Sequence, residues 1–183
     1  SMSRSTAAIA AALSIIILGC QFNNEDEVPL ATQHFNQGTD NYEQGNYQGA
    51  INDFTNVLKI VPNDAWAYYI RGLAKDNLED HQGAIADFTK AIENNPQDRY
   101  AYLNRGVAKA KLEDYQGAVA DHTKAIEIYP GFISAFEKRG IAQESLNDLY
   151  RACLDWRMAE DLFESGERDG GGKDSIEWVK KKC

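Results

Sequence analysis

The sequence predicts an all-α solenoid of four stacked helix pairs followed by a capping helix. Three observations predict it: glycine recurs every 34 residues, alanine recurs with the same period, and proline closes the first three periods. The series are Gly38, Gly72, Gly106 and Gly140; Ala50, Ala84, Ala118 and Ala152; and Pro62, Pro96 and Pro130. A unit of this length cannot bury its apolar faces alone, so neighbouring units must stack.

Each period supplies two helices. In the second period we expect helices over residues 65–77 and 82–93, with a turn at Glu79-Asp80. The periodic glycine and alanine let the two helices cross closely, because neither projects a large side chain. A column of larger side chains fills the seam: Phe54, Phe88, His122 and Trp156. Proline ends the second helix, and in the fourth period Glu164 takes its place.

A 34-residue period with glycine, alanine and proline in this order resembles the tetratricopeptide repeat (TPR). The resemblance implies a right-handed superhelical solenoid of four TPR helix pairs, at residues 31–64, 65–98, 99–132 and 133–166. In such solenoids the first helices line a concave groove that receives a peptide or a partner helix.

The 34-residue register assigns candidate binding residues to this groove. They are Phe35, Asn36, Trp66, Tyr69, Tyr100, Asn104 and Lys138. Aromatic side chains are common interface anchors because they bury a large area at a low entropy cost. Packing between neighbouring repeats is the alternative role for each of them, and it is the role we expect for Leu73, Val107 and Ile141.

One type of TPR domain grips a C-terminal aspartate with Lys, Asn and Arg side chains. Asn104 and Lys138 approximate two of these positions, whereas Tyr69, Leu73 and Ser134 stand where Lys, Asn and Lys would be needed. We therefore expect a more apolar peptide, or a helix with an aliphatic stripe, rather than an acidic tail.

Two charged columns share the same period. One holds Asp53, Asp87, Asp121 and Asp155, and the other holds Arg71, Arg105 and Arg139, with Gln37 in the first unit. The columns could form a row of charged functional sites. We favour Arg–Asp hydrogen-bonded pairs between packed helices, repeated because the scaffold repeats.

The N-terminal segment, residues 1–19, carries one charge, Arg4, and an apolar run. Residues 7–19 would form about 20 Å of helix, too short for a ~30 Å bilayer core but suited to a signal peptide. The run ends in Ile17-Leu18-Gly19-Cys20, which resembles the lipobox of bacterial lipoproteins. The alternative is a buried apolar helix with an incidental cysteine.

The lipobox resemblance implies lipidation of Cys20, followed by a polar linker through residue 30. It places the protein in the bacterial cell envelope, anchored to the bilayer and facing the periplasm. Gln21 fits sorting to the outer membrane rather than the inner one.

The C-terminal segment, residues 167–183, combines a glycine-rich break with an apolar-sided helix that should cap the last repeat. With Cys20 lipidated, Cys153 and Cys183 are the two remaining thiols. An even count in an oxidising compartment predicts a disulfide between them. Two free thiols are the alternative.

Charge and motif content argue against several other functions. With 19 Lys+Arg against 28 Asp+Glu, the net charge of −9 opposes binding to nucleic acid. His34, His81 and His122 lie in different units, and His-x-x-x-His and Cys-x-x-Cys pairs are lacking, so we expect no metal site and no cofactor. An enzyme ranks last among the possible functions.

Together these features predict a membrane-anchored adaptor or scaffold within an envelope assembly complex. The alternative is a self-associating structural subunit whose groove holds another copy or its own apolar N-terminal segment.

Overall fold

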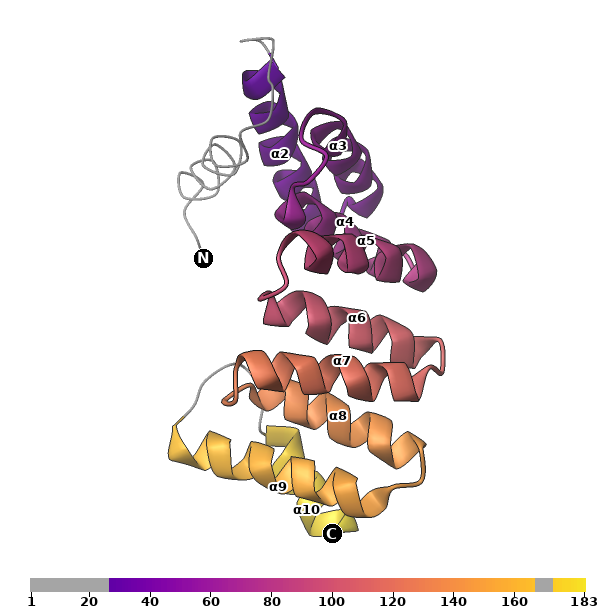
Figure 1. Ribbon diagram of the computed structural model, residues 1–183, viewed down its shortest axis with the longest axis vertical. Coiled ribbons are helices and arrows are strands. Elements are labelled where there is room, and N and C mark those ends of the chain that lie inside the picture. Colours follow the sequence, from indigo (N-terminus) through magenta and orange to yellow (C-terminus); the bar gives the residue numbers. More distant parts are fainter. Residues whose placement is uncertain (1–26, 167–172) are drawn as a thin grey trace. The chain divides into compact units, whose positions relative to one another are not determined.

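The computed structural model describes residues 27–166 and 173–183, and within them nine α-helices and no strand. The helices are α2 (Glu27–Glu43), α3 (Tyr47–Ile60), α4 (Ala65–Asn77), α5 (His81–Asn94), α6 (Arg99–Lys111), α7 (Tyr115–Ile128), α8 (Ile133–Ser145), α9 (Leu149–Ser165) and α10 (Lys173–Lys182) (Figure 1). The predicted all-α fold of four helix pairs and a C-terminal helix is confirmed. The signal segment, Cys20 and the glycine-rich break lie outside the described residues.

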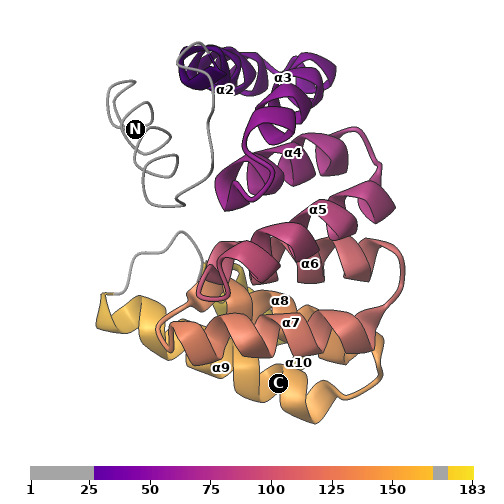
Figure 2. The same ribbon diagram turned by 45° about the horizontal axis from the view of Figure 1, so that its top comes forward.

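The helices belong to two compact units, and the boundary between them in the sequence falls between Pro96 and Gln97. In the first unit α2 pairs with α3, α4 pairs with α5, and α3 packs against α4. In the second unit α6 pairs with α7, α8 pairs with α9, and α7 packs against α8 (Figure 2). Each unit is therefore a stack of two repeats.

The second helix of each repeat starts in the same way. Its N-cap side chain accepts a hydrogen bond from the backbone N–H three residues later, which satisfies one of the free donors of the first turn. These caps are Asn46, Asp80, Asp114 and Asp148. The residue before each cap has a positive φ and closes the turn; these residues are Gly45, Glu79, Glu113 and Asn147.

One helix boundary differs from the sequence prediction, and one helix is longer than its equivalents in the other repeats. The helix α2 begins at Glu27, inside the segment assigned to the linker, and Pro29 is tolerated because it falls in the first turn. The helix α9 runs to Ser165, where the left-handed Gly166 caps it. It has 17 residues against 14 in α3, α5 and α7, because no proline stops it.

The glycine and aromatic columns meet in the core as the sequence predicts. A β-carbon on Gly72 would lie 2.8 Å from the ring of Phe88, and one on Gly140 would lie 2.4 Å from the ring of Trp156. The two rings are fully buried. The space of the missing side chain is thus filled by the ring from the second helix.

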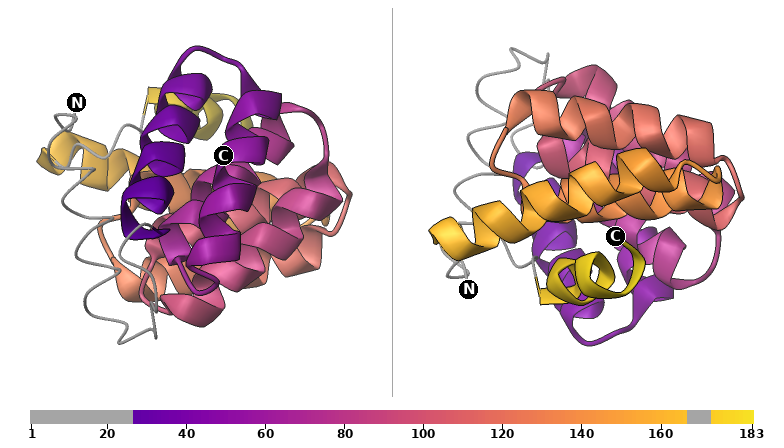
Figure 3. Two further views of the ribbon diagram at one scale, coloured as in Figure 1. Left: turned by 90° about the horizontal axis from the view of Figure 1, so that it is seen from above. Right: turned by 90° about the horizontal axis from the view of Figure 1, so that it is seen from below.

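The helix α10 caps the second unit, as expected (Figure 3, right panel). The ring of Trp178 packs on that of Trp156 with centroids 5.4 Å apart. At the end of α10, the sulfur atoms of Cys153 and Cys183 are 2.08 Å apart, so the two residues are placed for a disulfide.

Candidate partner-binding surfaces

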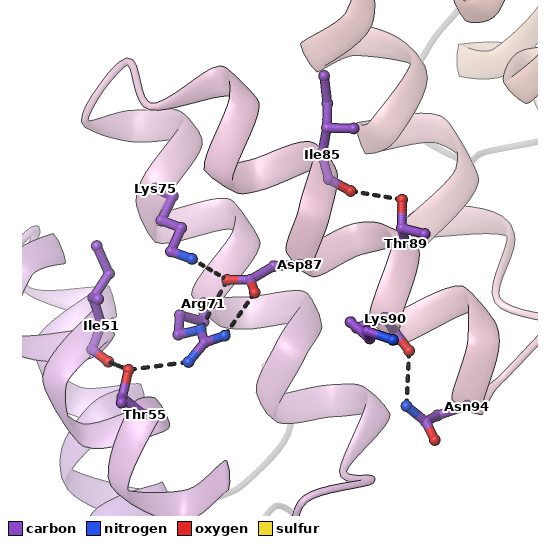
Figure 4. Close-up of polar contacts among 9 residues, drawn as sticks. All are labelled: Ile51, Thr55, Arg71, Lys75, Ile85, Asp87, Thr89, Lys90 and Asn94. Atoms are coloured by element: carbon purple, nitrogen blue, oxygen red, sulfur yellow. Dashed lines mark hydrogen bonds and ion pairs between the residues drawn. The ribbon is translucent and has the colours of Figure 1, made fainter.

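A repeated ion pair fixes the first helix of a repeat to the second. The Arg71 guanidinium donates to both oxygens of Asp87 at 2.8 and 2.7 Å, and Lys75 adds a contact of 2.8 Å (Figure 4). Arg71 also donates to Thr55 at 3.1 Å, so it connects α4 to α3 as well as to α5.

The second unit repeats this arrangement with Arg105–Asp121 and Arg139–Asp155. The acidic partners are buried, and both oxygens of each carboxylate are engaged. The predicted scaffold role of the two charged columns is confirmed.

In the first repeat, the prediction that Gln37 replaces the arginine is wrong. Gln37 is exposed, and Asp53 instead accepts a 2.8 Å hydrogen bond from Asn41 and lies 3.2 Å from Nδ1 of His34. Residues 34 and 41 lie one turn on either side of residue 37 on the same helix face, so both reach the same carboxylate. His34 is therefore a partly buried partner of Asp53.

The first unit presents an aromatic surface on α4. Trp66 is 48% exposed, and its ring lies 5.3 Å from that of Tyr69, which is buried and in turn contacts Phe88. Trp66 is thus supported from behind by a buried ring. Tyr69 itself offers little surface to a ligand.

The two candidates on α2, Phe35 and Asn36, also differ in exposure to solvent. Phe35 is 2% exposed and packs edge-on against Phe54, with centroids 5.6 Å apart. Asn36, the next residue, is exposed. Of the four candidates in the first unit, Asn36 and Trp66 therefore remain open to solvent.

The second unit presents Tyr100 on α6, at the register position of Trp66. Tyr100 is 43% exposed, and its ring packs edge-on against that of the buried Phe132, with centroids 5.3 Å apart. The guanidinium of Arg99 lies 4.8 Å from the centroid of Tyr100 and 4.6 Å from that of Tyr129. Tyr100 therefore belongs to an aromatic cluster organised around a cation.

The sequence patterns did not assign Arg99 and Phe132 to the groove, although the residue type of Phe132 is unusual for its position. It stands at the N-cap of α8, where the equivalent residues of α4 and α6 are Asp64 and Asp98, and it makes no side-chain cap bond. An apolar residue in place of a capping aspartate indicates that packing decides this position.

The remaining candidates are polar. Asn104 donates to the backbone oxygen of Tyr100 at 2.9 Å, and Lys138 on α8 is exposed. Next to Lys138, Glu137 is buried because Ser175 of α10 donates to it at 2.7 Å. Lys182 contacts Glu144, about two turns further along α8, at 2.5 Å. The capping helix thus engages part of the first helix of the last repeat.

Among the described residues, no group of three or more His, Cys, Asp or Glu is placed to hold a metal ion. None of the helices described is both long and apolar enough to span a bilayer. The exposed aromatic, amide and cationic groups of these surfaces are instead suited to binding.

Models of known families match most of the repeat region. A TPR repeat model matches residues 38–76, and tetratricopeptide repeat models match residues 65–98 and 100–132. No curated protein matches the sequence.

Several solved structures share the fold. A structure of MamA is 25% identical with a TM-score of 0.70, and the match covers 88% of this chain and 90% of that one. YrrB, described as a TPR protein with an unusual peptide-binding site, is 21% identical with a TM-score of 0.68, and the match covers 74% of this chain and 70% of that one. The first TPR of Spaghetti (RPAP3), bound to an HSP90 peptide, is 21% identical with a TM-score of 0.58, and the match covers 64% of this chain and 88% of that one. The chain therefore belongs to the tetratricopeptide-repeat family, and its fold is that of a protein-binding scaffold.

Proposed function

We propose that the chain is a membrane-anchored TPR adaptor that binds a peptide or helix of a partner protein within an envelope assembly complex. The observation that carries the proposal is the pair Trp66 and Tyr100. They occupy the same register position 34 residues apart, are about half exposed, and are each backed by a buried aromatic ring. Rigid, half-exposed aromatic side chains are favourable binding anchors because little entropy is lost on contact.

The chemistry of these surfaces favours an apolar ligand with some amide and anionic character. Asn36 and Lys138 are exposed, whereas Tyr69 and Leu73 stand where an aspartate-gripping site would need polar groups. The HSP90 peptide bound to RPAP3 ends in aspartate. For this chain we propose a helix or peptide with an aliphatic stripe.

The anchor is proposed on the lipobox resemblance. Acylated Cys20 would hold the protein on the bilayer, facing the periplasm, with the outer membrane as its location. The placement of Cys153 beside Cys183 supports an oxidising compartment, since disulfides persist outside the cytosol. Neither the anchor nor the binding surface requires catalysis, and we propose none.

Site-specific photocrosslinking in native membranes tests the binding surface. A photoreactive amino acid replaces Trp66 or Tyr100 in the full chain. Control chains carry it at Ala86 or Ala120, exposed positions on the second helices. We expect residues 66 and 100 to crosslink to the same partner protein, and the control positions to give no such product. Products from the control positions alone would overturn the proposal, and a homodimer from 66 and 100 would favour the self-associating subunit.

The anchor is tested separately. Metabolic labelling with an alkyne fatty acid should mark the wild-type protein in the membrane fraction. A Cys20→Ser chain should lose both the label and the membrane association. A labelled or membrane-bound Cys20→Ser chain would refute lipidation at this residue.

A further inference from the structure

The outward face of the second helices changes character in the last repeat. In α3, α5 and α7 three outward columns carry polar or small residues. The columns hold Gln48, Gln82 and Gln116; Asn52, Ala86 and Ala120; and Asn56, Lys90 and Lys124. In α9 the same columns hold Tyr150, Leu154 and Met158, which are 76%, 48% and 45% exposed. We call these three residues the α9 stripe.

The α9 stripe is a departure from the repeat, so the scaffold does not explain it. The other three repeats fold with polar or alanine residues at these positions, which shows that packing requires no large apolar group there. Large exposed apolar patches on soluble domains typically mark interaction sites.

The stripe borders a shallow hollow of about 280 Å³. Its lining comes from α9 and the end of the chain: Leu149, Tyr150, Cys153, Leu154, Arg157, Lys182 and Cys183. Lys182, at the end of α10, both lines this hollow and lies over the ring of Trp156, so the hollow is bordered by α10 and is not filled by it.

The charges beside the stripe indicate what covers it. Exposed charges flank the stripe: Arg151 lies before Leu154, whereas Asp161 and Glu164 lie after Met158, and Arg157 is at the midpoint of α9. The acidic Asp155 is buried and paired with Arg139. An antiparallel second copy of α9 would place Arg151, near one end of the stripe, against Asp161 of the partner subunit, near the other end.

We infer that two copies of this chain pair through the α9 stripe in an antiparallel, two-fold arrangement. A two-fold axis between Leu154 and Met158 sets Leu154 against Met158 of the partner subunit. It also sets Arg151 against Asp161 of the partner subunit. Such an interface is self-complementary, because each contact occurs twice.

The size of the surface sets the strength of the dimer. One helix face from each copy gives an interface at the small end of specific contacts. We therefore expect reversible, concentration-dependent association. The stripe is built from second-helix positions, whereas Trp66 and Tyr100 are on first helices, so a dimer would carry two sets of partner-binding surfaces and gain avidity.

Sedimentation velocity of the full chain over a micromolar to millimolar series tests the inference. The test variant, Tyr150→Gln/Leu154→Ala/Met158→Lys, installs the residues that α5 and α7 carry in the same columns. The control variant, Gln116→Glu/Lys124→Gln, alters the same face of α7. Thermal unfolding of both variants should match the wild type.

We expect the wild type and the control to dimerise and the test variant to stay monomeric. A monomeric wild type at every concentration would overturn the inference. So would a test variant that still dimerises, which would place self-association in the groove or on the apolar N-terminal segment.

Charge reversal tests the antiparallel pairing. Arg151→Glu and Asp161→Arg should each weaken the dimer by about ten-fold, because each sets like charges together. The double variant should restore the wild-type dissociation constant. A double variant weaker than either single one would refute this pairing.

Discussion

His122 lies directly against Gly106: a β-carbon added to that glycine would come within 2.5 Å of the imidazole Cε1. The imidazole occupies the column that holds Phe or Trp in the other repeats, and it is 1% exposed. Its Nδ1 has no hydrogen-bond partner. Burial is the main reason that the pKa of His122 is lowered from 6.5 to about 4. A polar ring thus fills an apolar socket in its neutral form.

This lowered pKa predicts a loss of stability in mild acid. Between pH 6.5 and about 4 the unfolded chain binds a proton at His122 and the folded chain does not, so protons favour unfolding in this window. The stabilising effect is complete above pH 6.5 and is lost as the pH falls towards 4. It amounts to about 3 kcal/mol over the window. Urea unfolding of the full chain at stepped pH measures it.

The matched variant is His122→Phe, which installs the residue of the first two repeats. It should remove this part of the pH dependence and stabilise the protein by about 1 kcal/mol at pH 7, since a buried unpaired nitrogen is removed. If wild type and variant lose stability in parallel between pH 6.5 and 4, burial of a neutral His122 is not the cause.

The ion pair between Arg71 and Asp87 predicts a large single-mutant cost. Arg71→Met should lower the free energy of unfolding by about 3 kcal/mol, because the buried carboxylate keeps Lys75 alone as a charged partner. Arg71→Met/Asp87→Leu should recover most of the loss. Lys90→Met, which removes an exposed pair with Glu93, should leave the free energy of unfolding nearly unchanged, because solvent screens that pair. Equal costs for the buried and exposed pairs would contradict this account.

The turn at Glu113 predicts a stabilising substitution. Glu113 has a φ of 63°, a conformation that costs a side-chain-bearing residue about 1 kcal/mol relative to glycine. The first repeat uses Gly45 at this position, with a φ of 76°. Glu113→Gly should therefore raise the free energy of unfolding by about 1 kcal/mol, and Gly45→Ala should lower it by a similar amount. A loss of stability in Glu113→Gly would show that its side chain has another role.

The placement of Cys153 and Cys183 predicts a disulfide that stabilises the cap. The two residues are 30 positions apart in sequence, so the crosslink should contribute about 3–4 kcal/mol in the chain-entropy model. Cys183→Ser should lose this amount in urea unfolding without reductant and lose nothing with reductant. Mass spectrometry after thiol alkylation provides the direct check, because alkylation of both residues without reductant would disprove the bond.

Much of the fold follows from the period. Gly72 and Phe88 are 16 residues apart, and the same spacing of a small and a large residue recurs in every repeat, so one contact predicts all four. The spacing of Arg71 and Asp87 recurs in the third and fourth repeats and predicts the ion pairs there. The prediction fails where the period breaks. Gln37 occupies the position that holds arginine in the other repeats, but it does not bind Asp53. His34 and Asn41, from the neighbouring turns of the helix, contact that carboxylate instead.

The sequence by itself determined the helix pairs, their close crossings and the buried ion pairs, because these depend on residue type at a fixed spacing. The tertiary structure decided which candidate binding residues are open. Phe35 and Trp66 are both aromatic groove candidates, yet one is buried against Phe54 and the other is half exposed. Glu137 is covered because Ser175, 38 residues later, returns to it. Exposure depends on which distant side chain fills the adjacent space, and no local pattern encodes that.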